Sequence, residues 1–237
     1  MGDRSNRKRS NRGRSHRKRS GRLPGITPEY LRQIEEGEVL PSPEVIDRLA
    51  DVYQLGDLAR RHLHDLYSSE VDGPAPVPDI VVTNEHRRRV DDHSPHPAAL
   101  LDHRWNVLHA NAGYRRVLPG IGAGENNLLA WMFLDDRARS IVIDHTAEAR
   151  KLVGRFKLTY GTFLGDPEFE DILRRCESDE FFDAAWSDFR ALTDSPGPTP
   201  MNWRDPGTDR LLRVTEQRVP DSEWLTLHTA TPIDQQL

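Results

Sequence analysis

Residues 25–55 form the string GITPEYLRQIEEGEVLPSPEVIDRLADVYQL, which predicts two short helices joined by a tight turn. Thr27 suits the N-cap of the first helix, because Pro28 then falls at the first helical position, where its missing N–H costs nothing. Gly37 comes after this helix as a left-handed C-terminal stop. Apolar residues then recur at helical spacing after Ser42, the expected N-cap of the second helix.

Two capped helices joined by a few residues are the recognition half of a helix-turn-helix module, which lays one helix into the DNA major groove. The exposed side of the first helix, opposite Leu31 and Ile34, is the expected DNA-facing surface. Arginine and glutamine there suit base edges and phosphates. The predicted DNA-binding residues are Thr27, Glu29, Tyr30, Arg32 and Gln33.

The segment 1–22 is strongly basic. It holds ten Lys or Arg against Asp3 alone, a net charge of +9, which leaves −14 on the rest of a chain whose net charge is −5. It has no aliphatic or aromatic residue between Met1 and Leu23, so we expect a disordered arm when it is free. The arm suits DNA phosphates through counterion release. The first alternative is that this segment covers the acidic remainder of the same chain. The second is that it is a start-site or frameshift artefact.

Composition excludes several classes of protein. Cys176 is the single cysteine, which excludes an intramolecular disulfide and a cysteine-based zinc site and fits a reducing compartment. No apolar stretch is long enough to span a bilayer or to form a signal peptide, so the expected location is cytoplasmic, without membrane contact.

The segment 71–84 contains three closely spaced prolines and predicts a stiff, extended linker between residues 23–70 and 85–237. An ordered edge segment packed on the second domain is the alternative, because Ile80, Val81 and Val82 come directly after the prolines.

The second domain is predicted to be α+β. Apolar residues flank Asp102-His103-Arg104, which indicates two short strands joined by a polar turn, and residues 211–219 and 223–230 alternate as a further antiparallel pair. Helical periodicity runs through 138–160 and from Asp166-Pro167 onward. The expected architecture is a small, all-α helix-turn-helix remnant followed by an antiparallel sheet with covering helices on one face.

The string YLRQIEEGEVLPSPEVIDRLADVYQL resembles the third and fourth helices of the Xre/Cro-type helix-turn-helix family, whose Leu-x-x-Ile-Glu-x-Gly signature falls on residues 31–37. The remainder of the chain resembles the MmyB-like transcription regulators, in which this module precedes a PAS-like ligand-binding domain. The matching motifs are AALLDHRWNVLHAN at 98–111, ENNLLAWMFLDDRAR at 125–139, SDEFFDAAW at 178–186 and WLTLHTATP at 224–232.

The resemblance implies a PAS-like domain that binds a small apolar or fatty-acid-like effector. It also implies two helices ahead of the recognition helix, where this chain has its basic segment, so the module is predicted to be partial. His145 stands where a Trp is usual. Large aromatic residues predict an apolar pocket, with a packed core as the alternative. The predicted ligand-binding residues are Trp131, Phe133, His145, Phe181, Trp186 and Phe189.

Catalysis receives no support, because the common nucleophile, phosphate-loop and zinc-protease motifs are missing from the sequence. Neither a metal nor a cofactor is predicted. The predicted function is a transcriptional regulator that binds double-stranded DNA, as a homodimer on two half-sites, and senses an effector. The alternative is a protein-interaction or ligand-sequestering module that has lost specific DNA binding.

Overall fold

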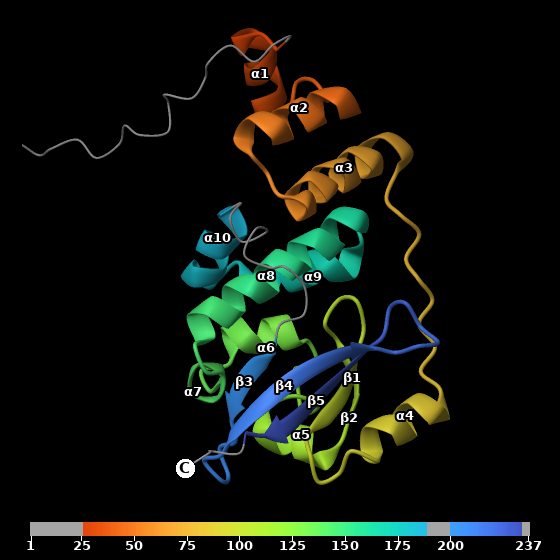
Figure 1. Ribbon diagram of the computed structural model, residues 1–237, viewed down its shortest axis with the longest axis vertical. Helices are drawn as coiled ribbons and strands as arrows, with labels where there is room; N and C mark the ends of the chain where they lie inside the picture. Colours follow the sequence, from red (N-terminus) through yellow and green to blue (C-terminus); the bar gives the residue numbers. More distant parts are fainter. Residues whose placement is uncertain (1–25, 189–199, 234–237) are drawn as a thin grey trace, which may run out of the picture. The chain divides into compact units, whose positions relative to one another are not determined.

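The computed structural model describes residues 26–188 and 200–233, which divide into two compact units (Figure 1). The N-terminal unit ends at Tyr53, and the C-terminal unit begins at Gln54. The basic segment 1–22, predicted to be a disordered arm, lies outside the described residues.

The described part of the N-terminal unit consists of helices α1 (Pro28–Glu35) and α2 (Pro43–Tyr53). The Thr27 hydroxyl accepts the backbone N–H of Tyr30 at 3.1 Å, so Thr27 caps α1 as predicted. Gly37 has a φ of +72°, the left-handed conformation expected where the first helix stops.

The C-terminal unit begins with helix α3 (Asp57–Asp72), which packs along α8 (His145–Thr162). A Cβ at Gly161 would come within 2.6 Å of the His62 Nδ1, so the two helices approach closely at this glycine. The Ser69 hydroxyl donates to the Gly161 carbonyl at 3.0 Å. The structure therefore places α3 with the C-terminal unit, whereas the sequence predicts a boundary after residue 70.

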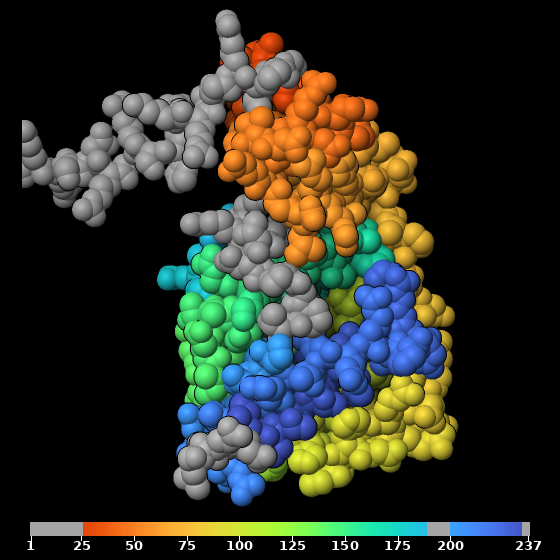
Figure 2. Space-filling view, in the orientation of Figure 1, coloured from red at the N-terminus to blue at the C-terminus, as the bar shows by residue number. Residues whose placement is uncertain are grey.

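Five strands form one antiparallel sheet in the order β2-β1-β5-β4-β3. Their bounds are β1 (Ala98–Leu101), β2 (Val107–Ala110), β3 (Met201–Arg204), β4 (Leu211–Arg218) and β5 (Thr226–Pro232). In the space-filling view β4 and β5 form part of the surface of this unit (Figure 2). Alternate residues of β4, such as Leu212 and Val214, are buried, while Arg213 and Thr215 are exposed.

Helices cover one face of the sheet and enclose the main core; Figure 1 shows α6 and α8 stacked on that side. They are α5 (Ala112–Val117), α6 (Leu128–Leu134), α7 (Ala138–Ile141), α8, α9 (Pro167–Cys176) and α10 (Glu180–Ser187). Tyr114, Trp131, Phe156 and Trp203 are among the largest fully buried side chains. The α+β prediction is confirmed.

The opposite face of the sheet carries a smaller apolar cluster beneath α4 (Asn84–Asp91). Val90 of α4 packs there with Leu100 of β1 and Leu227 of β5. Ile80 and Val82 pack against the same cluster, so the end of the proline-rich segment lies on the sheet. Strand β1 is buried on both faces as a result.

Local conformation differs from the sequence expectation in one helix. The predicted helix over 138–160 is interrupted between α7 and α8, because Asp144 has a φ of +54° and the N–H of Ile143 donates to the carbonyl of Asn202 in β3. This backbone contact connects the helical layer to an edge strand that the local sequence does not indicate.

Candidate functional site

Helix α1 carries the five residues predicted to face DNA. Thr27, Glu29 and Arg32 are exposed, while Tyr30 and Gln33 are half-buried. Three of the five side chains are therefore exposed on the helix surface.

Arg32 is occupied by acidic neighbours on its own helix. Its guanidinium donates to Glu29 Oε1 at 2.7 Å and also pairs with Glu36. The hydrogen bond from Arg32 lowers the pKa of Glu29. Residues 28–38 hold four glutamates and one arginine, so the surface of α1 has a net negative charge. Attraction to phosphate must therefore come from other positive groups, such as the basic segment.

The C-terminal unit contains a cavity of about 440 Å³ between α3, α8, the β1–β2 turn and the β4–β5 hairpin. Its apolar lining comes from Leu58, Leu101, Trp105, Leu158, Phe163 and Trp224. Its polar and charged lining comes from Arg61, Asp65, Asp102, His103, Arg155, Thr159, Thr162, Arg218 and Thr226. This mixture of apolar walls and a few polar groups is typical of a small-molecule site.

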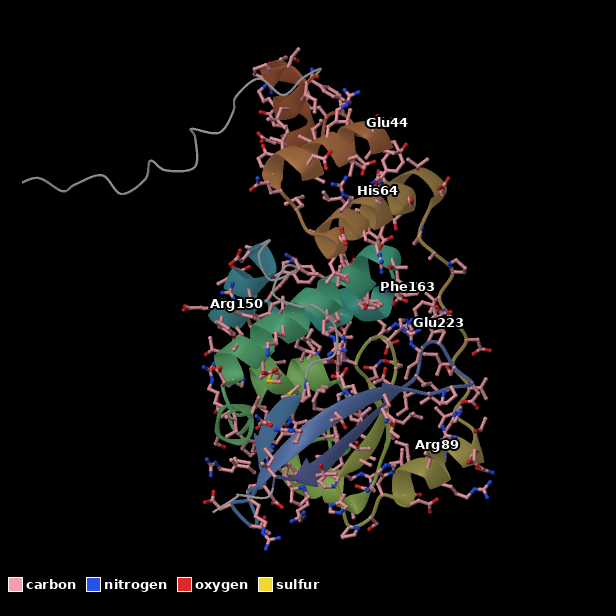
Figure 3. All side chains as sticks on the ribbon, viewed as in Figure 1. Glu44, His64, Arg89, Arg150, Phe163 and Glu223 are labelled. Carbon is pink, nitrogen blue, oxygen red and sulfur yellow. The ribbon has the colours of Figure 1, made fainter. Side chains whose placement is uncertain are left out.

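Three rings form one wall of the cavity. His103 lies 4.9 Å from Phe163 and 5.4 Å from Trp224 between ring centroids, and Phe163 lies 5.3 Å from Trp224. Figure 3 labels Phe163 at the end of α8 and Glu223 in the neighbouring hairpin. Burial, reinforced by Arg104, lowers the pKa of His103 to about 4, so this ring is uncharged at neutral pH.

Arg155 lines the cavity and forms an ion pair with Glu216, whose side chain is buried. Arg155 donates to both carboxylate oxygens of Glu216, at 2.9 and 2.5 Å, and its guanidinium lies 4.3 Å from the centroid of Trp105. Burial opposes ionisation of Glu216, but His228 at 3.3 Å and Arg155 outweigh it and hold the pKa of that carboxyl well below its usual range. Arg155 is therefore fixed in position and already neutralised.

The other charged residues of the lining include two exposed arginines, Arg61 and Arg218, and the half-buried Asp65. Arg61 and Asp65 come from α3, and burial raises the pKa of Asp65 although Arg61 opposes this. Arg218 ends β4 and is exposed. Within residues 26–188 and 200–233, Arg218 has no ion-pair partner.

The five described residues among those predicted to bind ligand lie away from this cavity in the same unit. Trp131 is buried and its indole N–H donates to the carbonyl of Pro119 at 3.0 Å. The His145 Nε2 lies 2.9 Å from the carbonyl oxygen of Met132, at the end of α6. Phe189 lies outside the described residues.

The remaining three predicted residues come close to one another. Phe133 stacks on Phe181 with 6.0 Å between ring centroids, and Phe182 connects Phe133, at 5.0 Å, to Trp186, at 5.9 Å. Of the six predicted residues, the five in the described ranges are not among those that line the 440 Å³ cavity.

One sequence signal and one backbone feature of the structure point to the observed cavity better than aromatic content does. Strand alternation places Glu216 and Arg218 on the same face of β4 as Leu212 and Val214, and charges on a core-facing side are unusual. The polar turn after β1 also contains Trp105, which has a φ of +70°. A bulky residue in that conformation often marks a functional turn.

Metal binding and thiol chemistry find no support in the part of the chain that the structure describes. There, no group of three His, Cys, Asp or Glu side chains is arranged to hold a metal ion. Burial raises the pKa of Cys176 to about 12, which keeps this thiol unreactive. Among the described helices, none is long and apolar enough to cross a membrane.

Comparison with known families gives two matches. Residues 82–236 match the MmyB-like transcription regulator ligand binding domain, and residues 6–63 match a helix-turn-helix domain. The second match starts inside the basic segment, ahead of the predicted module boundary at residue 23. A search of curated proteins found no match. The chain belongs to the MmyB-like transcription regulator family and is a DNA-binding regulator with a ligand-binding domain.

Proposed function

We propose that the C-terminal unit binds a small, fatty-acid-like effector in the 440 Å³ cavity and that binding changes the affinity of the protein for DNA. The observation that carries this proposal is the cavity itself, whose apolar walls come from α3, α8, the β1–β2 turn and the β4–β5 hairpin. Its volume lies in the range of ligand pockets. Burying an acyl chain contributes about 0.8 kcal/mol per methylene before ordering costs, enough for micromolar binding by a medium-length chain.

Helix α3 offers a route from the cavity to the DNA-binding module. Leu58, Arg61 and Asp65 lie on one face of α3 and line the cavity. The same helix begins after α2 with only residues 54–56 between them. An effector that binds one placement of α3 more tightly than another therefore biases the DNA-binding module, in proportion to that difference in affinity.

On the DNA side, we propose that Thr27, Glu29, Tyr30, Arg32 and Gln33 face the major groove and that residues 1–22 contact phosphates. The acidic surface of α1 supports a role for the basic segment, because that surface repels DNA when it acts alone. A homodimer on two half-sites would supply the specificity that one short helix lacks.

The test is a DNA titration of the full chain with and without decanoic acid. We expect the acid to change the dissociation constant, and Trp224→Ala to reduce that change. Trp186→Ala is the matched variant at a predicted ligand residue outside the cavity, and we expect it to leave the response intact. If Trp186→Ala abolishes the response and Trp224→Ala does not, the effector binds among the aromatic residues around α10 instead.

A salt series separates the contribution of the basic segment. Removing residues 1–22 is expected to reduce the slope of log affinity against log salt by about 0.9 for each phosphate that the segment neutralises. An unchanged slope would mean that the segment does not touch phosphate.

The acidic surface of α1 also favours one rival, a ligand-sequestering module without specific DNA binding. This rival predicts that decanoic acid binds normally, while operator and random DNA bind equally weakly at every salt concentration. Preference for one DNA sequence would exclude it.

A further inference from the structure

We infer that the N-terminal unit self-associates through an apolar stripe on α2, with a second copy of this chain as the partner. The stripe consists of Val45, Leu49 and Val52, and Tyr53 continues it at the end of the helix. The inference rests on the homodimer of the proposed function and names the surface that forms it. It concerns a different unit from the cavity and does not depend on which molecule the cavity binds.

Helical geometry places the stripe on one side of α2. Side chains three, four and seven positions apart lie on the same face of a helix, and the three aliphatic residues of the stripe have these spacings. Ile46 and Ala50, on the neighbouring side, are buried, whereas Val52 is 40% and Tyr53 55% exposed. The rest of the stripe is half-buried. The apolar face of α2 is therefore wider than the part that a single chain buries.

The described part of the N-terminal unit has little core of its own. Among residues 26–53, only Ile26, Ile46 and Ala50 are buried hydrophobic side chains. Chains with fewer than about 40 ordered residues usually need a disulfide, a metal or oligomerisation to be stable. Residues 1–53 contain no cysteine, and no metal-binding group of side chains occurs in the part of this unit that the structure describes. Oligomerisation is the remaining source of stability.

The residues ahead of α1 cannot cover the stripe. The helix-turn-helix match starts at residue 6, but residues 2–22 contain no aliphatic or aromatic side chain. A segment of this composition has too little apolar surface to bury against the stripe. A second copy offers the same apolar surface, and two identical surfaces that meet about a two-fold axis must be self-complementary, as two apolar stripes are. The second copy also supplies the recognition helix for the second half-site.

The charges of α2 permit this approach. With about 3.6 residues per helical turn, Glu44, Asp47 and Asp51 fall on the side of α2 opposite the stripe. Figure 3 labels Glu44 on this helix. Two copies that meet stripe to stripe therefore keep these carboxylates apart. In an antiparallel arrangement, Leu49 lies beside the two-fold axis and contacts its own copy.

Sedimentation velocity of the full chain over a concentration series tests the interface. We expect a monomer–dimer equilibrium that Val52→Asp weakens more than about tenfold, because dimerisation would bury an unpaired carboxylate. Val81→Asp is the matched control, since Val81 is 66% exposed in the C-terminal unit, and it should leave the equilibrium within about twofold. High salt should not weaken the dimer, because its contacts are apolar and salt screens the repulsion between the two basic segments.

Disulfide formation tests the arrangement of the two copies. Leu49→Cys should form a covalent dimer on mild oxidation, because the two-fold axis brings the two copies of this position together. Val81→Cys should not. Cys176 is buried and its raised pKa keeps the thiol unreactive, so it does not contribute to the product. Thermal melts of Val52→Asp and Leu49→Cys close to that of the wild type separate the loss or gain of a dimer from unfolding.

Three results would overturn the inference. A wild-type chain that stays monomeric at every concentration would mean that no second copy covers the stripe. A dimer that Val52→Asp leaves intact would place the interface on another surface. Oxidation that links Leu49→Cys no faster than Val81→Cys would exclude the antiparallel arrangement. Only the first result also removes the homodimer of the proposed function, and none affects effector binding. If the wild type dimerises through α2 but binds no DNA, the proposed function fails and the inference stands.

Discussion

The C-terminal unit contains two aromatic regions that look alike in sequence and differ in structure. Around α10, the rings of Phe133, Phe182, Trp186 and Phe156 contact one another, with centroids 5.0–6.2 Å apart. Around the β1–β2 turn, Trp105, Phe163 and Trp224 border a cavity.

The difference lies in the neighbours of the rings. The rings of the first region belong to the main core or pack against it, so they fill the space between the elements around them. The second region is bordered by the Arg155–Glu216 ion pair and by further charged residues of the lining. These charged groups cannot move into the cavity without losing solvation or their ion-pair partners. In this unit, a cluster of aromatic residues therefore marks part of the packed core. Charged residues on the core-facing side of β4 mark the cavity.

The largest expected effect is a loss of stability in the packed region around α10. Phe182 is fully buried and contacts both Phe133 and Trp186. Phe182→Ala should lower the free energy of unfolding by about 4 kcal/mol, because it leaves a cavity in a close-packed core. Urea denaturation measures this change. Trp224→Ala, at the half-buried wall of the existing cavity, should cost much less, and equal costs would contradict the comparison.

The next effect concerns the inner end of the cavity. Glu216→Gln leaves Arg155 without its counter-charge and should lower the free energy of unfolding by about 3 kcal/mol at neutral pH. The depressed pKa of Glu216 means that its contribution is complete above the ordinary glutamate pKa and is lost as the pH falls below it. Asp171→Asn, which breaks an exposed pair with Arg174, is the control and should cost under about 0.5 kcal/mol. Similar costs would show that the inner pair is not fixed.

A smaller effect concerns the contact of α3 with α8. Burial and Lys157 lower the pKa of His62 from 6.5 to about 4. The unfolded chain therefore takes up a proton first, and stability should fall by roughly 2.5 kcal/mol as the pH falls between these values. Urea denaturation at several pH values measures the fall, which His62→Asn should reduce. His96→Asn, at an exposed histidine, should not reduce it; a change as large as that of His62→Asn would assign the pH dependence elsewhere.

The smallest expected effect is on the affinity of the cavity for its ligand. Trp224→Ala should weaken decanoic acid binding about tenfold, equivalent to about 1.4 kcal/mol, because it removes one apolar wall. Calorimetric titration measures the change. Trp186→Ala should leave the affinity within about twofold, and the reverse order would move the ligand site to the packed region.

Local sequence was sufficient for the elements whose ends have their own chemical signals. Thr27, Pro28 and Gly37 determine α1, and alternation determines β4 and β5, because capping, proline geometry and strand period act within a few residues. The order of domains and the α+β class could be predicted from these elements and from the motifs of the MmyB-like family.

The cavity was decided only by tertiary structure. Its lining joins α3, the β1–β2 turn, α8 and the β4–β5 hairpin, which are distant along the chain. A break at Asp144 and the close approach of α3 at Gly161 set the path of α8, and neither has a strong local signal. Whether an aromatic side chain fills a core or borders a hollow depends on how completely other elements surround it, which is a property of packing and not of local sequence.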